Sequence, residues 1–69
     1  MKLKLTAKRD FETMNFWQEP FYITKGEKYD AELLKTDKGF EMIVLTLGGV
    51  NTAFEVRVIK EFFEIKEVK

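Results

Sequence analysis

The sequence predicts a small all-β domain whose five short strands curl into a barrel. Three observations support this fold class: apolar and polar residues alternate in short segments, glycines separate those segments, and no amphipathic stretch is long enough for a three-turn helix. With 69 residues, 45% of them apolar, the chain has material for one hydrophobic core. We therefore expect a single domain over residues 1–69.

The first expected strand covers residues 2–8, where Leu3, Leu5 and Ala7 share one face. Residues 9–20 lose this alternation and contain residues that favour turns, so they are interpreted as a long loop. The loop is unusually apolar, and we expect it to fold over the rest of the domain.

A tight turn is expected at residues 25–27, because Gly26 can adopt a positive φ without steric cost. Residues 28–33 follow as the second strand, with alternate residues on the same face. Residues 37–39 then predict a short hairpin loop.

Residues 40–47 are almost continuously apolar, which favours a central strand covered on both faces. A helix is the competing interpretation, but β-branched residues and the flanking glycines disfavour it. Residues 48–51 predict another hairpin turn, and residues 52–58 the fourth strand.

Residues 59–63 leave room for one helical turn, which we expect to be 3₁₀ because nothing extends it. Residues 64–68 close the chain as the last strand. A flat meander would expose two long edges, so we expect the sheet to close into a barrel with the first strand meeting the last.

The composition excludes several kinds of chemistry. The chain has no Cys and no His, so disulfides, thiolate or imidazole metal sites and His-based proton transfer are absent. Carboxylate pairs such as Asp10 and Glu12 lack the spacing of a hydrolase or a metal loop. We expect a protein that is not an enzyme and binds no cofactor or metal.

Charge and hydropathy bear on location and partners. Twelve basic and twelve acidic residues give a net charge of zero, so general attraction to nucleic acid or anionic membranes is not expected. No apolar run approaches the ~18 residues that a membrane span needs, and no hydrophobic signal segment begins the chain. The expected location is the cytoplasm.

The apolar loop supplies the main candidate site. Its large side chains have two interpretations: they cap the open end of a barrel too small to fill itself, or they stay partly exposed as an anchor for another protein. The candidate protein-binding residues are Phe11, Met14, Phe16, Trp17 and Pro20.

The basic residues near the N-terminus supply the alternative site. Lys2, Lys4, Lys8 and Arg9 either protect an edge strand from intermolecular pairing or contact single-stranded nucleic acid. A third possibility is a structural role by self-association through the first or last strand, and we expect a monomer or a weak homodimer.

The order of these segments resembles the Src homology 3 barrel. Residues 7–11, Ala-Lys-Arg-Asp-Phe, look like the exit of that family's first strand, and residues 21–27, Phe-Tyr-Ile-Thr-Lys-Gly-Glu, look like its diverging turn. Residues 37–39 and 48–51 match its next two hairpin loops, and residues 60–63 match its 3₁₀ turn. The resemblance implies a five-stranded barrel in which residues 8–27 form the long loop.

Family members that bind proline-rich peptides use a ledge of aromatic residues. Here Phe40 or a neighbour stands where a tryptophan is usual, Phe62 replaces a tyrosine, and Lys8 and Arg9 stand where an aromatic is usual. These departures argue against proline-rich ligands. The chain looks more like the small single-domain barrels of Gram-positive bacteria and their phages or prophages, some of which bind host proteins.

Overall fold

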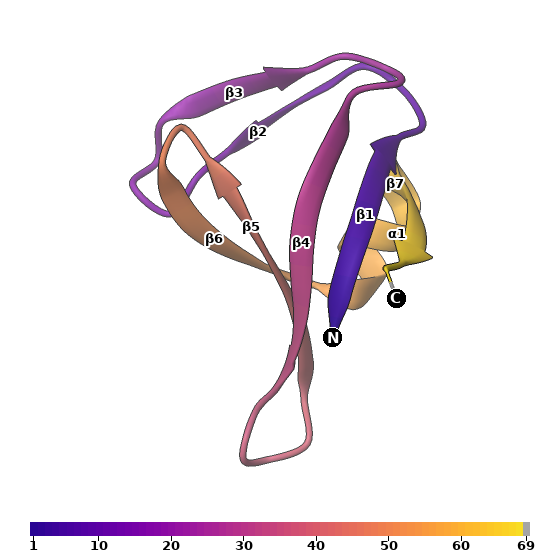
Figure 1. The fold of residues 1–69 in the computed structure, drawn as a ribbon. Coiled ribbons are helices and arrows are strands. Elements are labelled where there is room, and N and C mark those ends of the chain that lie inside the picture. The colour runs from indigo at the N-terminus through magenta and orange to yellow at the C-terminus, as the bar shows by residue number, and fades with distance from the viewer. Residues whose placement is uncertain (69) are drawn as a thin grey trace.

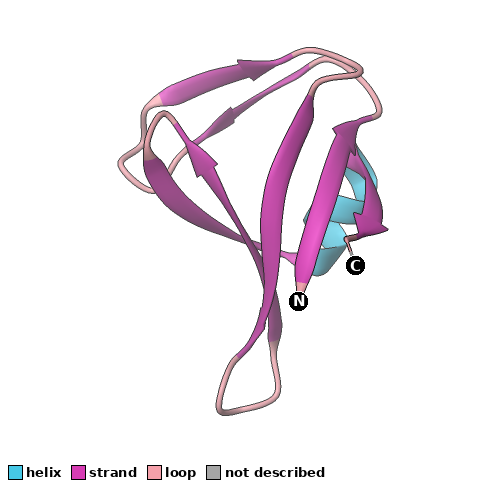
Figure 2. Cartoon of the chain, in the orientation of Figure 1, coloured by secondary structure: helices cyan, strands magenta, loops and turns pink. Residues whose placement is uncertain are grey.

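The computed structural model describes residues 1–68 and consists mainly of strands (Figures 1 and 2). In chain order the elements are β1 (Lys2–Ala7), β2 (Phe11–Met14), β3 (Pro20–Ile23), β4 (Lys28–Lys35), β5 (Glu41–Leu47), β6 (Val50–Glu55), α1 (Val56–Phe62) and β7 (Phe63–Glu67). The predicted all-β class is confirmed.

Five strands form a curved antiparallel sheet in the order β6-β5-β4-β1-β7, and β2 pairs with β3 in a separate hairpin. The expected meeting of the first and last strands is confirmed, because β1 pairs with β7 from Leu3↔Glu67 to Ala7↔Phe63. The expected closure is wrong: in residues 1–68 the edge strands β6 and β7 do not pair, and the sheet stays open. Figure 1 shows α1 beside β7, where it links the two edges.

The core lies inside the curve of the sheet. Residues Leu3, Leu5 and Ala7 of β1 are buried, as their alternation predicts, while their neighbours on β1 face outward. Burial of these apolar side chains is the main stabilising term of so small a domain. The other buried apolar residues are Ile23, Ala31, Ile43, Leu45, Leu47, Ile59 and Phe63.

Strand β5 is covered on one face only, which corrects the expectation of cover on both. Its residues Ile43, Leu45 and Leu47 are at most 2% exposed. Met42 and Val44 lie on the opposite face and are half-buried. Within residues 1–68 no second layer covers this outer face. The partial burial of its side chains comes from their neighbours on β4 and β6.

The predicted long loop contains the β2–β3 hairpin, which Figure 1 shows crossing the open end of the sheet. Phe11 pairs with Ile23 and Met14 with Pro20. Residues 11–14 hold too short an alternation to be recognised as a strand from sequence. The hairpin places one face toward the core and leaves the other face in solvent.

The predicted 3₁₀ turn at residues 59–63 is wrong, because an α-helix occupies Val56–Phe62 and ends the fourth strand at Glu55. Residues Val56, Ile59 and Phe62 recur at a spacing of three, so they lie on one side of the helix and pack against the core. The Phe63 backbone N–H bonds the Ile59 carbonyl oxygen and ends the helix. Tertiary packing overrides the β-branched residues that predicted a strand to Val58.

The turn between β5 and β6 requires glycine. Gly48 has a φ of 61°, and a Cβ at this position would overlap the ring of Phe21 from β3. The turn therefore presses directly against the hairpin. This contact places the end of β5 beside the loop that joins β2 to β3.

Candidate functional site

The loop between β2 and β3 is organised around the buried side chain of Asn15, which is 4% exposed. Its Nδ2 donates to Glu19 Oε1 at 2.8 Å and to the Leu47 carbonyl oxygen at 3.2 Å. Its Oδ1 accepts from the backbone N–H groups of Trp17 at 2.9 Å and Glu19 at 3.0 Å. One side chain thus closes the loop and ties it to the end of β5.

A second tether joins the loop to β6. The Phe16 backbone N–H donates to Thr52 Oγ1 at 3.1 Å, and Thr52 is itself buried. Gln18 adopts a φ of 63°, and its N–H donates to the Asn15 carbonyl oxygen at 2.9 Å. Because both flanks of Trp17 are fixed in this way, the loop backbone is held in one conformation.

The loop displays its two aromatic side chains to solvent. Phe16 is 76% exposed and Trp17 is 72% exposed, although large aromatic residues are usually buried in so small a domain. On the solvent face of the hairpin, Met14 pairs with Pro20, Tyr22 follows Pro20 by two residues on the same face of β3, and all three are exposed. We call the surface formed by these residues the aromatic ledge: Met14, Phe16, Trp17, Pro20 and Tyr22.

The structure separates the five predicted protein-binding residues into two groups. Met14, Phe16, Trp17 and Pro20 are all exposed on the β2–β3 hairpin or its loop, and the exposure of Phe16 and Trp17 rules out a role for these two as a cap of the core. Phe11 is half-buried and packs against the core, so it is not part of the aromatic ledge.

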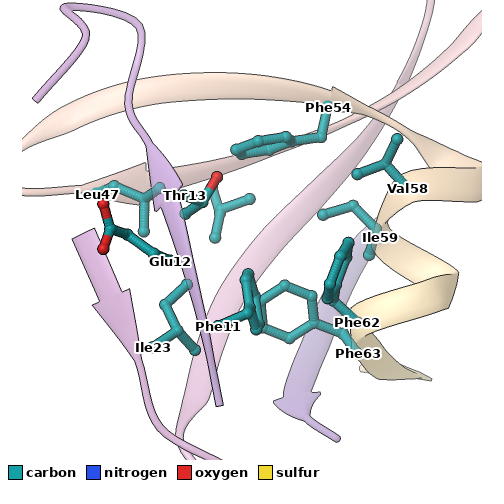
Figure 3. Close-up of a pocket in the computed structure, with 11 residues that line it drawn as sticks. Phe11, Glu12, Thr13, Ile23, Leu47, Phe54, Val58, Ile59, Phe62 and Phe63 are labelled. Atoms are coloured by element: carbon teal, nitrogen blue, oxygen red, sulfur yellow. The ribbon is translucent and has the colours of Figure 1, made fainter. Parts of the chain in front are cut away.

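Phe11 packs against the helix and the last strand. Its ring centroid lies 4.5 Å from that of Phe62 and 5.4 Å from that of Phe63. With Phe54 and Val58 these rings line an apolar cavity of about 70 Å³, and Figure 3 shows Phe11, Phe62 and Phe63 gathered on one side of it. Small-molecule pockets have volumes of about 300–1,000 Å³, so this cavity is a packing gap of the core.

Sequence reasoning missed two residues of the site. Asn15 is one of the turn-favouring residues of the 9–20 segment, and its buried hydrogen bonds arise from the fold. Tyr22 belongs to the segment that resembles the diverging turn and is not among the predicted site residues, yet it is 65% exposed beside Glu12, its partner across the hairpin. Residues 20–23 are all apolar, so the sequence carries no polar alternation that indicates the outward direction of Tyr22, and its exposure follows from the burial of Ile23 on the opposite face of β3.

Two of the predicted basic residues lie on β1. Lys2 is exposed, and Lys4 pairs with Asp30 of β4, with Nζ 2.6 Å from Oδ1. Exposed pairs of this kind contribute about 0–1 kcal/mol, so the pair neutralises charge more than it stabilises the sheet.

The other two basic residues contact the helix end. Lys8 Nζ donates to the Lys60 carbonyl oxygen at 2.9 Å. The Arg9 guanidinium lies 3.4 Å from Glu61 Oε1 and 4.7 Å from the centre of the Phe62 ring. These contacts tie the chain after β1 to α1.

Titratable groups with shifted pKa values lie at the turn before β4. Burial, followed by the hydrogen bond to Glu27, raises the pKa of Tyr29 to about 12. Hydrogen bonds from Tyr29 and from the Thr24 backbone N–H lower the pKa of Glu27. The Tyr29 hydroxyl donates to Glu27 Oε2 at 2.7 Å, so this pair serves to fix the turn.

The described residues also bear on metal binding, on membrane spans and on the contacts of the Asp10 carboxylate. Residues 1–68 contain no cluster of three or more side chains able to hold a metal ion and no helix long and apolar enough to span a membrane. Asp10, one of the carboxylates considered above, accepts the Lys25 backbone N–H at 2.6 Å and so has a structural contact.

Comparison of the chain with protein-family models, curated proteins and solved structures gives no match. The aromatic ledge is the feature of the described residues that bears most directly on function.

Proposed function

We propose that this chain is a small Src homology 3-like domain that acts without catalysis and binds a partner protein through the aromatic ledge. The observation that carries the proposal is the display of Phe16 and Trp17 by a loop fixed around buried Asn15. Exposed aromatic residues on a preorganised loop are typical of protein-binding surfaces.

The arrangement of strands supports the fold part of this proposal. The last strand lies beside the first, a long hairpin follows the first strand, and a short helix precedes the last, as in the expected barrel. The open sheet and the α-helical geometry of residues 56–62 are departures from that expectation.

The energy available from Trp17 is sufficient for a binding anchor. An aromatic side chain buries about 150–250 Å² and each Å² contributes about 25 cal/mol, so covering the exposed 72% of Trp17 contributes about 3 kcal/mol. Because hydrogen bonds already fix the loop, little conformational entropy is lost on binding. We expect Trp17→Ala to weaken partner binding by about 2–4 kcal/mol, the range of interface hot spots.

Charge near the ledge indicates the kind of partner. The hairpin and its loop, residues 11–23, contain two acidic residues and no basic residue, which gives them a net charge of −2. Glu12 and Glu19 lie next to ledge residues in the hairpin. A partner surface with an apolar pocket surrounded by basic residues complements this arrangement. A cytoplasmic host protein bound by a phage or prophage protein is the biological setting that we propose.

The test compares affinity capture from a bacterial lysate by the wild type, Trp17→Ala and Phe40→Ala. Phe40 is a matched control because it is 66% exposed but lies in the loop between β4 and β5, away from the ledge. The proposal expects a partner that the wild type and Phe40→Ala retain and that Trp17→Ala loses. Equal recovery of every protein by all three forms would refute the role of the ledge.

A further inference from the structure

The outer edge of β7 offers backbone groups to another strand. Two backbone hydrogen bonds continue the β1–β7 pairing at its two ends, in the register of the ladder. The Lys8 N–H donates to the Phe62 carbonyl oxygen, and the Val68 N–H donates to the Lys2 carbonyl oxygen. Because antiparallel pairs alternate between hydrogen-bonded and non-hydrogen-bonded, the even-numbered residues of β7 bond β1. The backbone groups of Phe63, Ile65 and Glu67 therefore point away from the sheet.

The helix uses one of these outward groups. The Phe63 N–H bonds the Ile59 carbonyl oxygen, whereas the backbone groups of Ile65 and Glu67 belong to the outer edge. The side chains of Glu64, Lys66 and Glu67 at this edge are exposed, and Ile65 is half-buried. Figure 1 shows β7 at the side of the molecule opposite β6.

Charge selects one register for pairing this edge with itself. In an antiparallel pair centred on Ile65, each Glu64 faces Lys66 of the second copy, at a non-hydrogen-bonded position where Cα atoms are about 4.5 Å apart. Centring the pair on Glu64 or on Lys66 instead places like charges opposite each other, which is destabilising. The sequence of β7 is therefore complementary to itself in one register.

The single chain leaves Lys66 in an unfavourable position. Lys66 lies directly opposite Lys4 in the β1–β7 ladder, and the Asp30 carboxylate pairs with Lys4 from the other side. A second copy would bring its Glu64 to Lys66 and offset this repulsion.

We propose that two copies of this chain associate through their β7 edges, with Ile65 opposite Ile65 and Glu64 opposite Lys66, to form one continuous ten-stranded sheet. This inference goes beyond the proposed function because it concerns a different surface. Few backbone hydrogen bonds and exposed ion pairs hold the pair, so the dimer is weak and weakens further with added salt. A dimer carries two aromatic ledges and can bind a multivalent partner by avidity.

Charge reversal tests the register. Glu64→Lys makes the two facing positions both positive, and Lys66→Glu makes them both negative, so each variant is expected to be monomeric in sedimentation equilibrium at concentrations where the wild type associates. Mixing the two variants restores opposite charges at both contacts and is expected to give a heterodimer. Circular dichroism establishes that each variant is folded.

Matched controls change charge on β4, which lies inside the sheet. Glu32→Lys and Lys35→Glu carry the same charge changes at exposed positions and are expected to associate as the wild type does. Trp17→Ala should also associate normally, which separates this proposal from the function of the ledge. A wild type that stays monomeric at millimolar concentration, single variants that associate like the wild type, or a mixture that does not associate would each overturn the proposal.

Discussion

Replacing Asn15 with alanine tests the organisation of the loop that carries the aromatic ledge. The side chain makes four hydrogen bonds, of which the one to the Leu47 carbonyl oxygen is buried and the other three are partly buried. A typical hydrogen bond contributes about 1 kcal/mol net, and an unsatisfied buried group costs about 1–3 kcal/mol. Since water can reach the partly buried partners, we expect Asn15→Ala to lower the free energy of unfolding by about 2–4 kcal/mol.

The assay is urea unfolding followed by far-ultraviolet circular dichroism. Asn51→Ala is the matched control, because Asn51 is exposed and its side chain accepts one hydrogen bond, from Thr46 Oγ1 at 2.9 Å. We expect the control to lose at most about 1 kcal/mol. If Asn15→Ala is no less stable than Asn51→Ala, buried Asn15 does not hold the loop, and the reasoning is wrong.

Two further predictions concern the turns. Gly48→Ala should lower the free energy of unfolding by about 2–4 kcal/mol, because it combines left-handed backbone strain with overlap of the Phe21 ring. Gly49→Ala has the strain but open space around its Cβ, and it should lower the free energy of unfolding by about 1 kcal/mol. Equal losses in thermal unfolding would contradict the contact between Gly48 and Phe21. Burial and the bond to Glu27 raise the pKa of Tyr29 to about 12, which a spectrophotometric titration of the Tyr22→Phe variant should show. A pKa at the ordinary tyrosine value of 10.0 would mean that Tyr29 is neither buried nor bonded to Glu27. Since folding raises this pKa, the contribution of Tyr29 to stability is complete below pH 10.0 and is lost as the pH rises toward about 12.

The strands of the sheet were largely predictable because their alternation is local. The spacing of Leu3, Leu5 and Ala7 places one face of β1 in the core whichever strands surround it. The need to protect edges predicts both the pairing of β1 with β7 and closure of the sheet. The pairing is present, whereas α1 joins β6 to β7 in sequence and these two strands do not pair within residues 1–68.

The helix could not be recognised from local preference. Val56 and Val58 favour a strand, and the N-cap residue Glu55 makes no side-chain capping hydrogen bond. The helix forms because Ile59 is buried to 2% exposure among residues from distant strands, and those contacts are absent from a local segment.

The sequence predicts most residues of the site but not whether their side chains point into the core or into solvent. The sequence places aromatic residues in the loop, yet the choice between a cap and an exposed surface depends on what lies beneath. Here Phe21 and Ile23 provide apolar side chains toward the core from β3, so Trp17 is not needed there. The bond from Asn15 to Leu47 joins residues 32 apart and has no local signal.

Quenching of tryptophan fluorescence by acrylamide tests the central claim most directly, because Trp17 is the only tryptophan of the chain. With 72% of its side chain exposed, the folded protein should emit at long wavelength and be quenched nearly as efficiently as the protein unfolded in urea. Emission at short wavelength with strong protection from acrylamide would place Trp17 in the core and contradict the account.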